Sequence, residues 1–283
     1  YSFLLIKVMP MYRSLLIFIF FFVILSAKSV FGAPEIKKII SPLGIEIWYV
    51  QEKSLPILAV DIVFKNAGFV TEPLEIQGIG RLVSITLNEG AGDLESLDFL
   101  RRIEELSIDL RFNIGTDTFG IDLRTLTKNK DEAFSLLGLA LNKPRFDEGP
   151  VERMRDLLIN DITRRLNIPD DIVGKAWLAA AYPNHPYGRN SRGSIETVGN
   201  ITIQDLKDFV STRFTRDRVV VGAVGDVEPE EIARLIDISL GSLPVNGPKF
   251  EINNQPPATD GEMVVINQDI PQSTALIGAK GIL

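Results

Sequence analysis

The feature that most constrains the fold is the succession of strand-like and helix-like stretches that begins at about residue 36. Residues 45–50 alternate partly between apolar and polar side chains, and residues 57–64 are dense in β-branched residues, as is typical of strands. Residues 77–88 are expected to form a helix, which the turn at Gly90 and Gly92 ends. Strands and helices mixed in this way predict an α+β domain.

The same mixture continues to about residue 240. Strands are expected at 107–113 and 119–126, joined by a hairpin-type connection, and a buried strand is expected at 218–224. Further helices are expected at 94–106, 130–141, 147–166, 170–181, 202–214 and 230–240.

Composition shifts divide the chain into segments. Residues 36–241 are expected to form the first domain, and residues 242–260, rich in Pro, Gly and Asn, a linker. A new strand at Glu262 to Ile266 would open a second domain, 261–283, which we expect to be truncated at Leu283.

The N-terminal 33 residues resemble a targeting segment. Leu15 to Leu25 is an unbroken apolar run that follows Arg13 and precedes small and polar residues up to Ala33. This order is typical of a secretory signal peptide, and the run is shorter than the roughly 20 residues that cross a bilayer. We therefore expect an exported protein, periplasmic or associated with the envelope. An uncleaved membrane anchor through Leu15 to Leu25 is the alternative.

Charge and residue usage exclude several functions. The net charge is −7 without a basic run, so nucleic acid is not an expected partner. The chain has no cysteine, which excludes thiol chemistry and cysteine-ligated zinc. His185 is its one histidine, whereas a hydrolytic zinc site normally takes two or three.

Five short strings, in this order, resemble the insulinase/pitrilysin family of zinc metallopeptidases, which includes mitochondrial processing peptidase. They are Gly78-Ile79-Gly80-x-Leu82, Asn88-Glu89-Gly90-Ala91-Gly92, Asn184-His185-Pro186-Tyr187-Gly188, Asp205-Leu206-x-x-Phe209 and Val224-Gly225-Asp226-Val227. The resemblance implies a mainly antiparallel sheet covered by helices, and normally two such domains in a chain.

The resemblance also implies where a zinc site would lie. In the family, the helix after the third strand carries His-x-x-Glu-His, which holds zinc and activates a water, and a later helix supplies a further Glu ligand. The corresponding positions here are Arg81, Ser84, Ile85 and Asp161. Arginine has no lone pair for zinc and isoleucine has no donor atom, so we predict no catalytic residues and no bound cofactor.

Two hypotheses concern single side chains. Arg81 and Asp161 would lie where two ligands of one metal would, so their charges would pair across that site, unless both side chains point into solvent. His185 lies between two prolines. It would be either a lone acid or base or, as the resemblance favours, a structural part of a turn.

The resulting functional hypothesis is a non-catalytic homologue of these peptidases. It would complete a heterodimer with a catalytic subunit that carries the intact zinc motif, and it would bind peptide or unfolded polypeptide. One alternative is a structural subunit of a membrane or envelope complex, like the peptidase-derived core subunits of respiratory complexes. The other, an active zinc endopeptidase, conflicts with the missing ligands.

Overall fold

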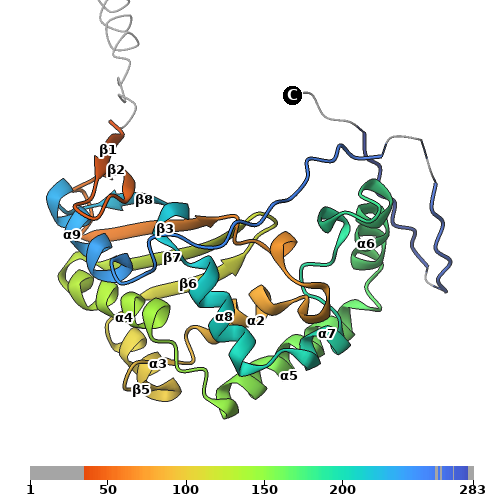
Figure 1. Ribbon diagram of the computed structural model, residues 1–283, viewed down its shortest axis with the longest axis horizontal. Coiled ribbons are helices and arrows are strands. Elements are labelled where there is room, and N and C mark those ends of the chain that lie inside the picture. The colour runs from red at the N-terminus through yellow and green to blue at the C-terminus, as the bar shows by residue number, and fades with distance from the viewer. Residues whose placement is uncertain (1–34, 259–260, 262, 270, 280–283) are drawn as a thin grey trace, which may run out of the picture. The chain divides into compact units, whose positions relative to one another are not determined.

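The computed structural model describes residues 35–258, 261, 263–269 and 271–279 (Figure 1). The predicted signal segment, 1–33, lies outside these residues. Within the described residues, no helix is both long and apolar enough to cross a membrane.

The centre of the fold is a six-stranded sheet with the order β1-β2-β8-β3-β7-β6. Neighbouring strands are antiparallel throughout, except for the parallel pair β2 and β8. The mainly antiparallel sheet implied by the family resemblance is therefore confirmed. Its strands are β1 (Lys37–Ile40), β2 (Glu46–Gln51), β3 (Ile57–Lys65), β6 (Asp109–Ile114), β7 (Thr118–Leu126) and β8 (Val219–Gly225).

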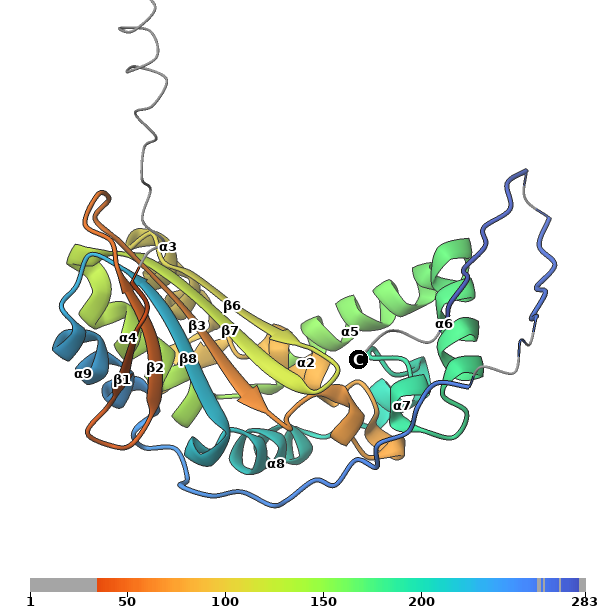
Figure 2. The same cartoon turned by 90° about the horizontal axis from the view of Figure 1, so that it is seen from above.

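The two faces of the sheet differ because side chains alternate along each strand. In β3, Leu58, Val60, Ile62 and Phe64 are buried, whereas Asp61 between them is exposed. The buried face joins the core under α3 (Ser96–Glu105), α4 (Lys130–Asn142), α8 (Ile203–Arg213) and α9 (Pro229–Leu240), while the opposite face carries no helix layer (Figure 2).

Helices lie along one side of the sheet and extend beyond its β6 edge. They are α2 (Ile79–Thr86), α3 (Ser96–Glu105), α4 (Lys130–Asn142), α5 (Glu148–Arg165), α6 (Pro169–Ala181), α7 (Ile195–Asn200), α8 (Ile203–Arg213) and α9 (Pro229–Leu240). The 3-10 turns are η1 (Phe69–Thr71), η2 (Leu74–Ile76), η3 (Thr127–Asn129), η4 (Pro186–Gly188) and η5 (Arg216–Arg218). A two-stranded ribbon, β4 (Gly90–Ala91) and β5 (Leu94–Glu95), lies beside α3.

The structure differs from the sequence expectations in four places. The strand expected at Glu262 to Ile266 is wrong for residues 263–266, which have no regular secondary structure; Glu262 lies outside the described residues. Val264 and Val265 are exposed there, without a strand beside them to complete a ladder. The helix expected at 77–88 is shorter, because Gly78 stands before its first turn, and α7 and β1 were not anticipated.

Candidate functional site

The helix α2 starts in a closely packed junction with the turn before α7. Gly78, the residue before the helix, has φ of 97°, a conformation that residues with a side chain rarely adopt. A Cβ there would lie 2.4 Å from the carbonyl oxygen of Arg192. The glycine at position 78 therefore allows α2 and this turn to meet backbone to backbone.

A buried carboxylate caps the N-terminus of α2. Glu72 Oε2 accepts a hydrogen bond from the Gly78 amide at 2.7 Å, and Oε1 accepts one from the Gly80 amide at 2.9 Å. Burial raises the pKa of Glu72 to about 7, although these bonds and the charges of Arg213 and Arg189 oppose the shift. The sequence reasoning missed this residue. An acid six positions before a glycine at a helix start was the only local signal.

The structure brings together the two helices that carry the predicted zinc positions, because α2 packs directly against α5. Arg81 and Ile85 on α2 are partly buried, and Ile85 packs against the core. Ser84 is buried, and its hydroxyl donates to the carbonyl of Arg81 at 2.8 Å. Asp161 lies toward the end of α5. Their equivalence to zinc ligands rests on the resemblance.

Asp161 is held by arginines other than the one expected. Its Oδ1 lies 2.6 Å from Arg164 Nη2, and its Oδ2 lies 2.9 Å from Arg165 Nε and 3.2 Å from Arg192 Nε. Burial opposes the ionised form of Asp161, but these arginines hold the pKa of its carboxyl below the ordinary value. Arg81 makes no ion pair within 4.0 Å among the described residues, so the predicted direct contact with Asp161 is wrong.

Arg81 nevertheless lies within the field of this cluster. Burial and the positive charges of Arg192 and Arg165 lower the pKa of its guanidinium, and the charge of Asp161 opposes them. The hypothesis of an ion pair between Arg81 and Asp161 is thus replaced by a different arrangement. Asp161 is shared among other arginines, and Arg81 is left with an excess of positive charge around it.

These residues do not fit a zinc ion. Arg81 and Ile85 offer no lone pair, Ser84 donates its hydroxyl to a backbone carbonyl, and Asp161 alone is a ligand of the usual kind. Among the residues that the structure describes, no group of three or more His, Asp or Glu could hold a metal ion. We therefore derive no metal-dependent step for this site.

His185 is buried in the turn between α6 and η4, away from α2. Its Nε2 lies 2.8 Å from the carbonyl oxygen of Asn253, and its Nδ1 accepts from the Tyr187 amide at 3.3 Å. Because a carbonyl only accepts, Nε2 carries the proton and both ring nitrogens are used. This geometry favours the structural interpretation of His185 over a lone acid or base.

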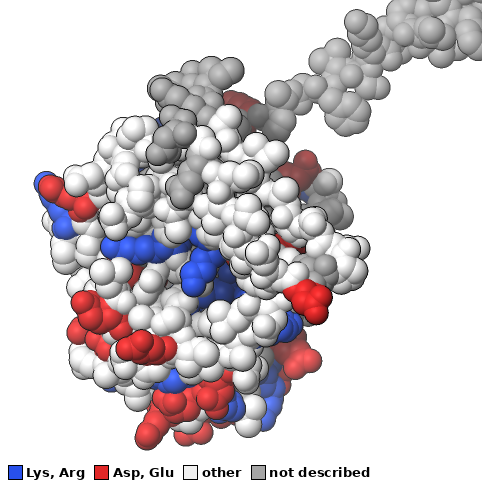
Figure 3. Space-filling view, turned by 90° about the vertical axis from the view of Figure 1, so that its right-hand side faces the viewer, with Lys and Arg blue, Asp and Glu red and all other residues white. Residues whose placement is uncertain are grey.

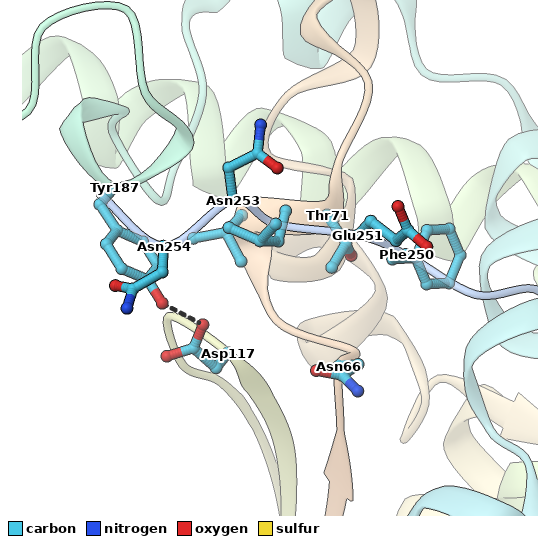
Figure 4. A pocket seen from close by; sticks show the side chains of 10 residues that line it. Asn66, Thr71, Asp117, Tyr187, Phe250, Glu251, Asn253 and Asn254 are labelled. Carbon is cyan, nitrogen blue, oxygen red and sulfur yellow. Dashed lines mark hydrogen bonds between the residues drawn. The ribbon is translucent and has the colours of Figure 1, made fainter.

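Near His185, the segment 250–254 forms one wall of a pocket of about 510 Å³ (Figure 4). The other wall comes from residues near β3, η1 and the β6–β7 turn. Tyr187 donates its hydroxyl to Asp117 Oδ1 at 3.1 Å across the pocket mouth. Phe250 lies under two cations, with Arg213 Cζ at 4.3 Å and Arg218 Cζ at 5.1 Å from its ring.

The helix-free face of the sheet carries a second, shallower depression. Asp61 and Asp122 are direct neighbours across β3 and β7, and Arg111 is the neighbour of Asp122 on β6. Burial and the charge of Asp122 raise the pKa of Asp61. Trp48 and Val224 are exposed on the same face by 46% and 42%. This surface therefore combines charged and apolar side chains.

Comparisons with known proteins agree with this architecture. The family described as "Peptidase M16 inactive domain" matches residues 200–282. A probable mitochondrial-processing peptidase subunit beta of Arabidopsis thaliana is 23% identical over 92% of this chain and 49% of its own length. The non-peptidase homolog YmxG of Helicobacter pylori is 22% identical over 85% of this chain and 55% of its own length. The chain spans about half the length of these relatives.

Solved structures show the same fold. The peptidase M16 inactive domain of Pseudomonas fluorescens superposes with a TM-score of 0.73 at 21% identity, over 78% of this chain and 54% of that one. Pitrilysin gives a TM-score of 0.69 at 19% identity, over 82% of this chain and 25% of its own. At these identities the likeness establishes the fold alone.

Proposed function

We propose that this chain, which is similar to members of the insulinase/pitrilysin family, serves as a non-catalytic subunit that binds peptide beside a catalytic peptidase. The observation that carries the proposal is the composition of α2. Arg81, Ser84 and Ile85 stand at the places of the family's two histidines and its glutamate. None of the three supplies a zinc ligand or a base of suitable pKa.

The surroundings of α2 are well ordered although its residues do not supply zinc ligands. Glu72 caps the helix, and α2 packs against both α5 and the edge strand β6. A junction packed in this way can hold side chains in place for a ligand. This packing supports a binding role for the chain.

The position of β6 suggests how peptide would bind. It is the last strand of the sheet, so one side of it has no partner strand among the described residues. An extended peptide would add to that side through main-chain hydrogen bonds, and its alternate side chains would meet α2 or the helix-free face. The unfolded or peptide substrate of our hypothesis matches this geometry.

The proposed partner is a peptidase that carries an intact His-x-x-Glu-His motif. The mitochondrial-processing relative is itself named as a subunit, which supports assembly for that protein and motivates the same proposal here. Export, inferred from residues 1–33, would place both chains in the periplasm or at the envelope.

Co-purification and cleavage assays test the proposal. The full chain would be co-expressed with a family peptidase that has the intact motif, with the Glu→Gln variant of that motif as the inactive control. We expect a stable complex that cleaves unfolded polypeptide faster than the partner alone. A partner with the same rate alone and in the mixture would contradict the proposal. A stable complex without that stimulation would favour the structural-subunit alternative.

A further inference from the structure

The region where the family places zinc is rich in arginine. Four guanidinium groups and two carboxylates meet between α2, the C-terminal part of α5, the start of α6 and the turn before α7. We call these residues the arginine cluster: Arg81, Arg164, Arg165, Arg192, Asp161 and Asp171.

The carboxylates of the arginine cluster are already engaged. Asp161 accepts from Arg164, Arg165 and Arg192, and Asp171 accepts from Arg165 at 3.0 Å through both oxygens. Arg81 makes no hydrogen bond or ion pair through its side chain with any described residue. With four positive and two negative groups, the cluster has an uncompensated positive charge, and Arg81 is the member whose guanidinium has no partner among the described residues.

Arg81 belongs to the helix that packs against β6. The preceding residue, Gly80, lies against Ile114, the last residue of β6, and a Cβ at Gly80 would lie 2.8 Å from Ile114 Cδ1. Arg81 itself is partly buried. Figure 3, seen from the side of α6 and α7, shows basic side chains gathered around a hollow near the middle of that face.

We propose that the arginine cluster is an oxyanion site that binds the carboxylate of an acidic peptide side chain, with Arg81 as its principal donor. The planar guanidinium offers parallel N–H groups that match the two oxygens of a carboxylate. Arg165 and Arg192 add positive charge, and because Asp161 pairs with them it does not pair with Arg81. The site therefore selects the opposite charge from the metal ion that the family holds there.

The energetics of Arg81 favour a ligand-binding role over a structural one. Partial burial costs the guanidinium hydration, and no described carboxylate contacts it in return. Two positive neighbours add repulsion. A side chain that lowers the stability of the unliganded protein is typical of a functional site. Removal of Arg81 should leave the melting temperature unchanged or raise it.

The inference rests on the proposed peptide binding and is tested by fluorescence anisotropy on the full chain. Two labelled extended peptides of equal length would be compared, one with Asp and Glu and one with Asn and Gln at the same positions. We expect the acidic peptide to bind more tightly and Arg81→Gln to weaken it by about tenfold, as expected for a charge-assisted bidentate contact. Arg81→Lys keeps the positive charge but not the two parallel N–H groups of the guanidinium. Its affinity for the acidic peptide should lie between those of the wild type and Arg81→Gln.

Arg101→Gln is the matched control, because Arg101 is exposed on α3 and pairs only with Asp98. It changes the net charge equally and should leave both peptides unaffected. Equal affinity for the two peptides, unchanged by Arg81→Gln, would overturn the inference while leaving peptide binding intact. Circular dichroism melting of each variant confirms that it is folded.

Inorganic phosphate provides the remaining comparison, measured by calorimetry. One possible result is that phosphate binds to the wild type but not to Arg81→Gln, while neither peptide binds to the wild type. This result would support the oxyanion site and contradict the proposed peptide-binding function. Absence of binding by phosphate and by both peptides would overturn the inference.

Discussion

Arg192 Nε lies 3.2 Å from Asp161 Oδ2, and this contact ties the turn before α7 to the helix α5. Asp161 is at the same time bonded to Arg164 and Arg165. The three partners come from two segments of the chain, so one carboxylate holds together arginines that would otherwise repel each other.

Asp161→Asn should therefore destabilise the protein by about 1 kcal/mol, since charge-assisted bonds are lost and the arginines remain. Added salt should raise the melting temperature of this variant more than that of the wild type, because salt screens the arginine repulsion. Asp98→Asn, which removes an exposed pair with Arg101, is the control and should have little effect on either quantity. Equal salt responses in all three proteins would contradict this interpretation.

The free energy of unfolding should depend on pH through the protonation of Glu72. Its pKa is raised to about 7 in the folded protein, above the ordinary value of 4.5. The folded state therefore binds this proton more tightly than the unfolded state. Its stabilising contribution is full below pH 4.5 and is lost as the pH rises through 7, by an amount on the order of 2–3 kcal/mol.

Urea unfolding of the wild type and Glu72→Gln at a series of pH values checks this prediction. The variant should lack the decline between about pH 4.5 and 7, because glutamine does not titrate. It should be less stable than the wild type at pH 5, since its amide cannot accept from both backbone amides that Glu72 caps. Parallel pH profiles of the two proteins would show that Glu72 does not titrate as described.

Arg155 should be the most costly single arginine to remove from α5. It is buried, and it donates to the carbonyls of Val198 and, at 2.8 Å, Ile201, which join α5 to the end of α7. Arg155→Leu leaves both carbonyls without this donor, and the free energy of unfolding should fall by about 2–4 kcal/mol. Arg101→Leu on the surface is the control. A loss no larger than that of the control would refute the assigned role.

The segment 244–258 should depend on Phe250 for its attachment. The ring packs under Arg213 and Arg218, and its neighbour Pro248 accepts a hydrogen bond from Arg218. Phe250→Ala should speed limited proteolysis within this segment while the melting temperature of the domain changes little. Val245→Ala, at a side chain that is 55% exposed, should leave the cleavage rate unchanged. Equal cleavage of the wild type and Phe250→Ala would contradict the attachment.

Much of the fold follows from local patterns. Strand β3 was predictable because residues 57–64 are dense in β-branched side chains, and β7 because apolar residues alternate along it. Helix α8 was predictable because Thr202 and Asp205 form a capping box. Helix α7 has only six residues, too few for an apolar period, although Ser194 and Thr197 cap it in the same way. The strand at 263–266 failed because a strand requires a partner, which no local pattern supplies.

The candidate site likewise contains some contacts that local sequence predicts and others that it does not. The bonds of Asp161 to Arg164 and Arg165 follow from helical spacing and were available from the sequence. The contact with Arg192 and the capping of α2 by Glu72 depend on how distant segments pack. The contact with Arg192, added to those with Arg164 and Arg165, gives a cluster with excess positive charge in place of the expected Arg81–Asp161 pair.

The central claim, that the family's zinc site persists in position without its ligands, is tested most directly by zinc calorimetry on the wild type and two variants. The wild type should take up no stoichiometric zinc. A variant that combines Arg81→His, Ser84→Glu, Ile85→His and Asp161→Glu should bind one zinc per chain, because α2 and α5 already hold these positions together. Stoichiometric zinc on the wild type, lost in Asp161→Asn, would contradict the account.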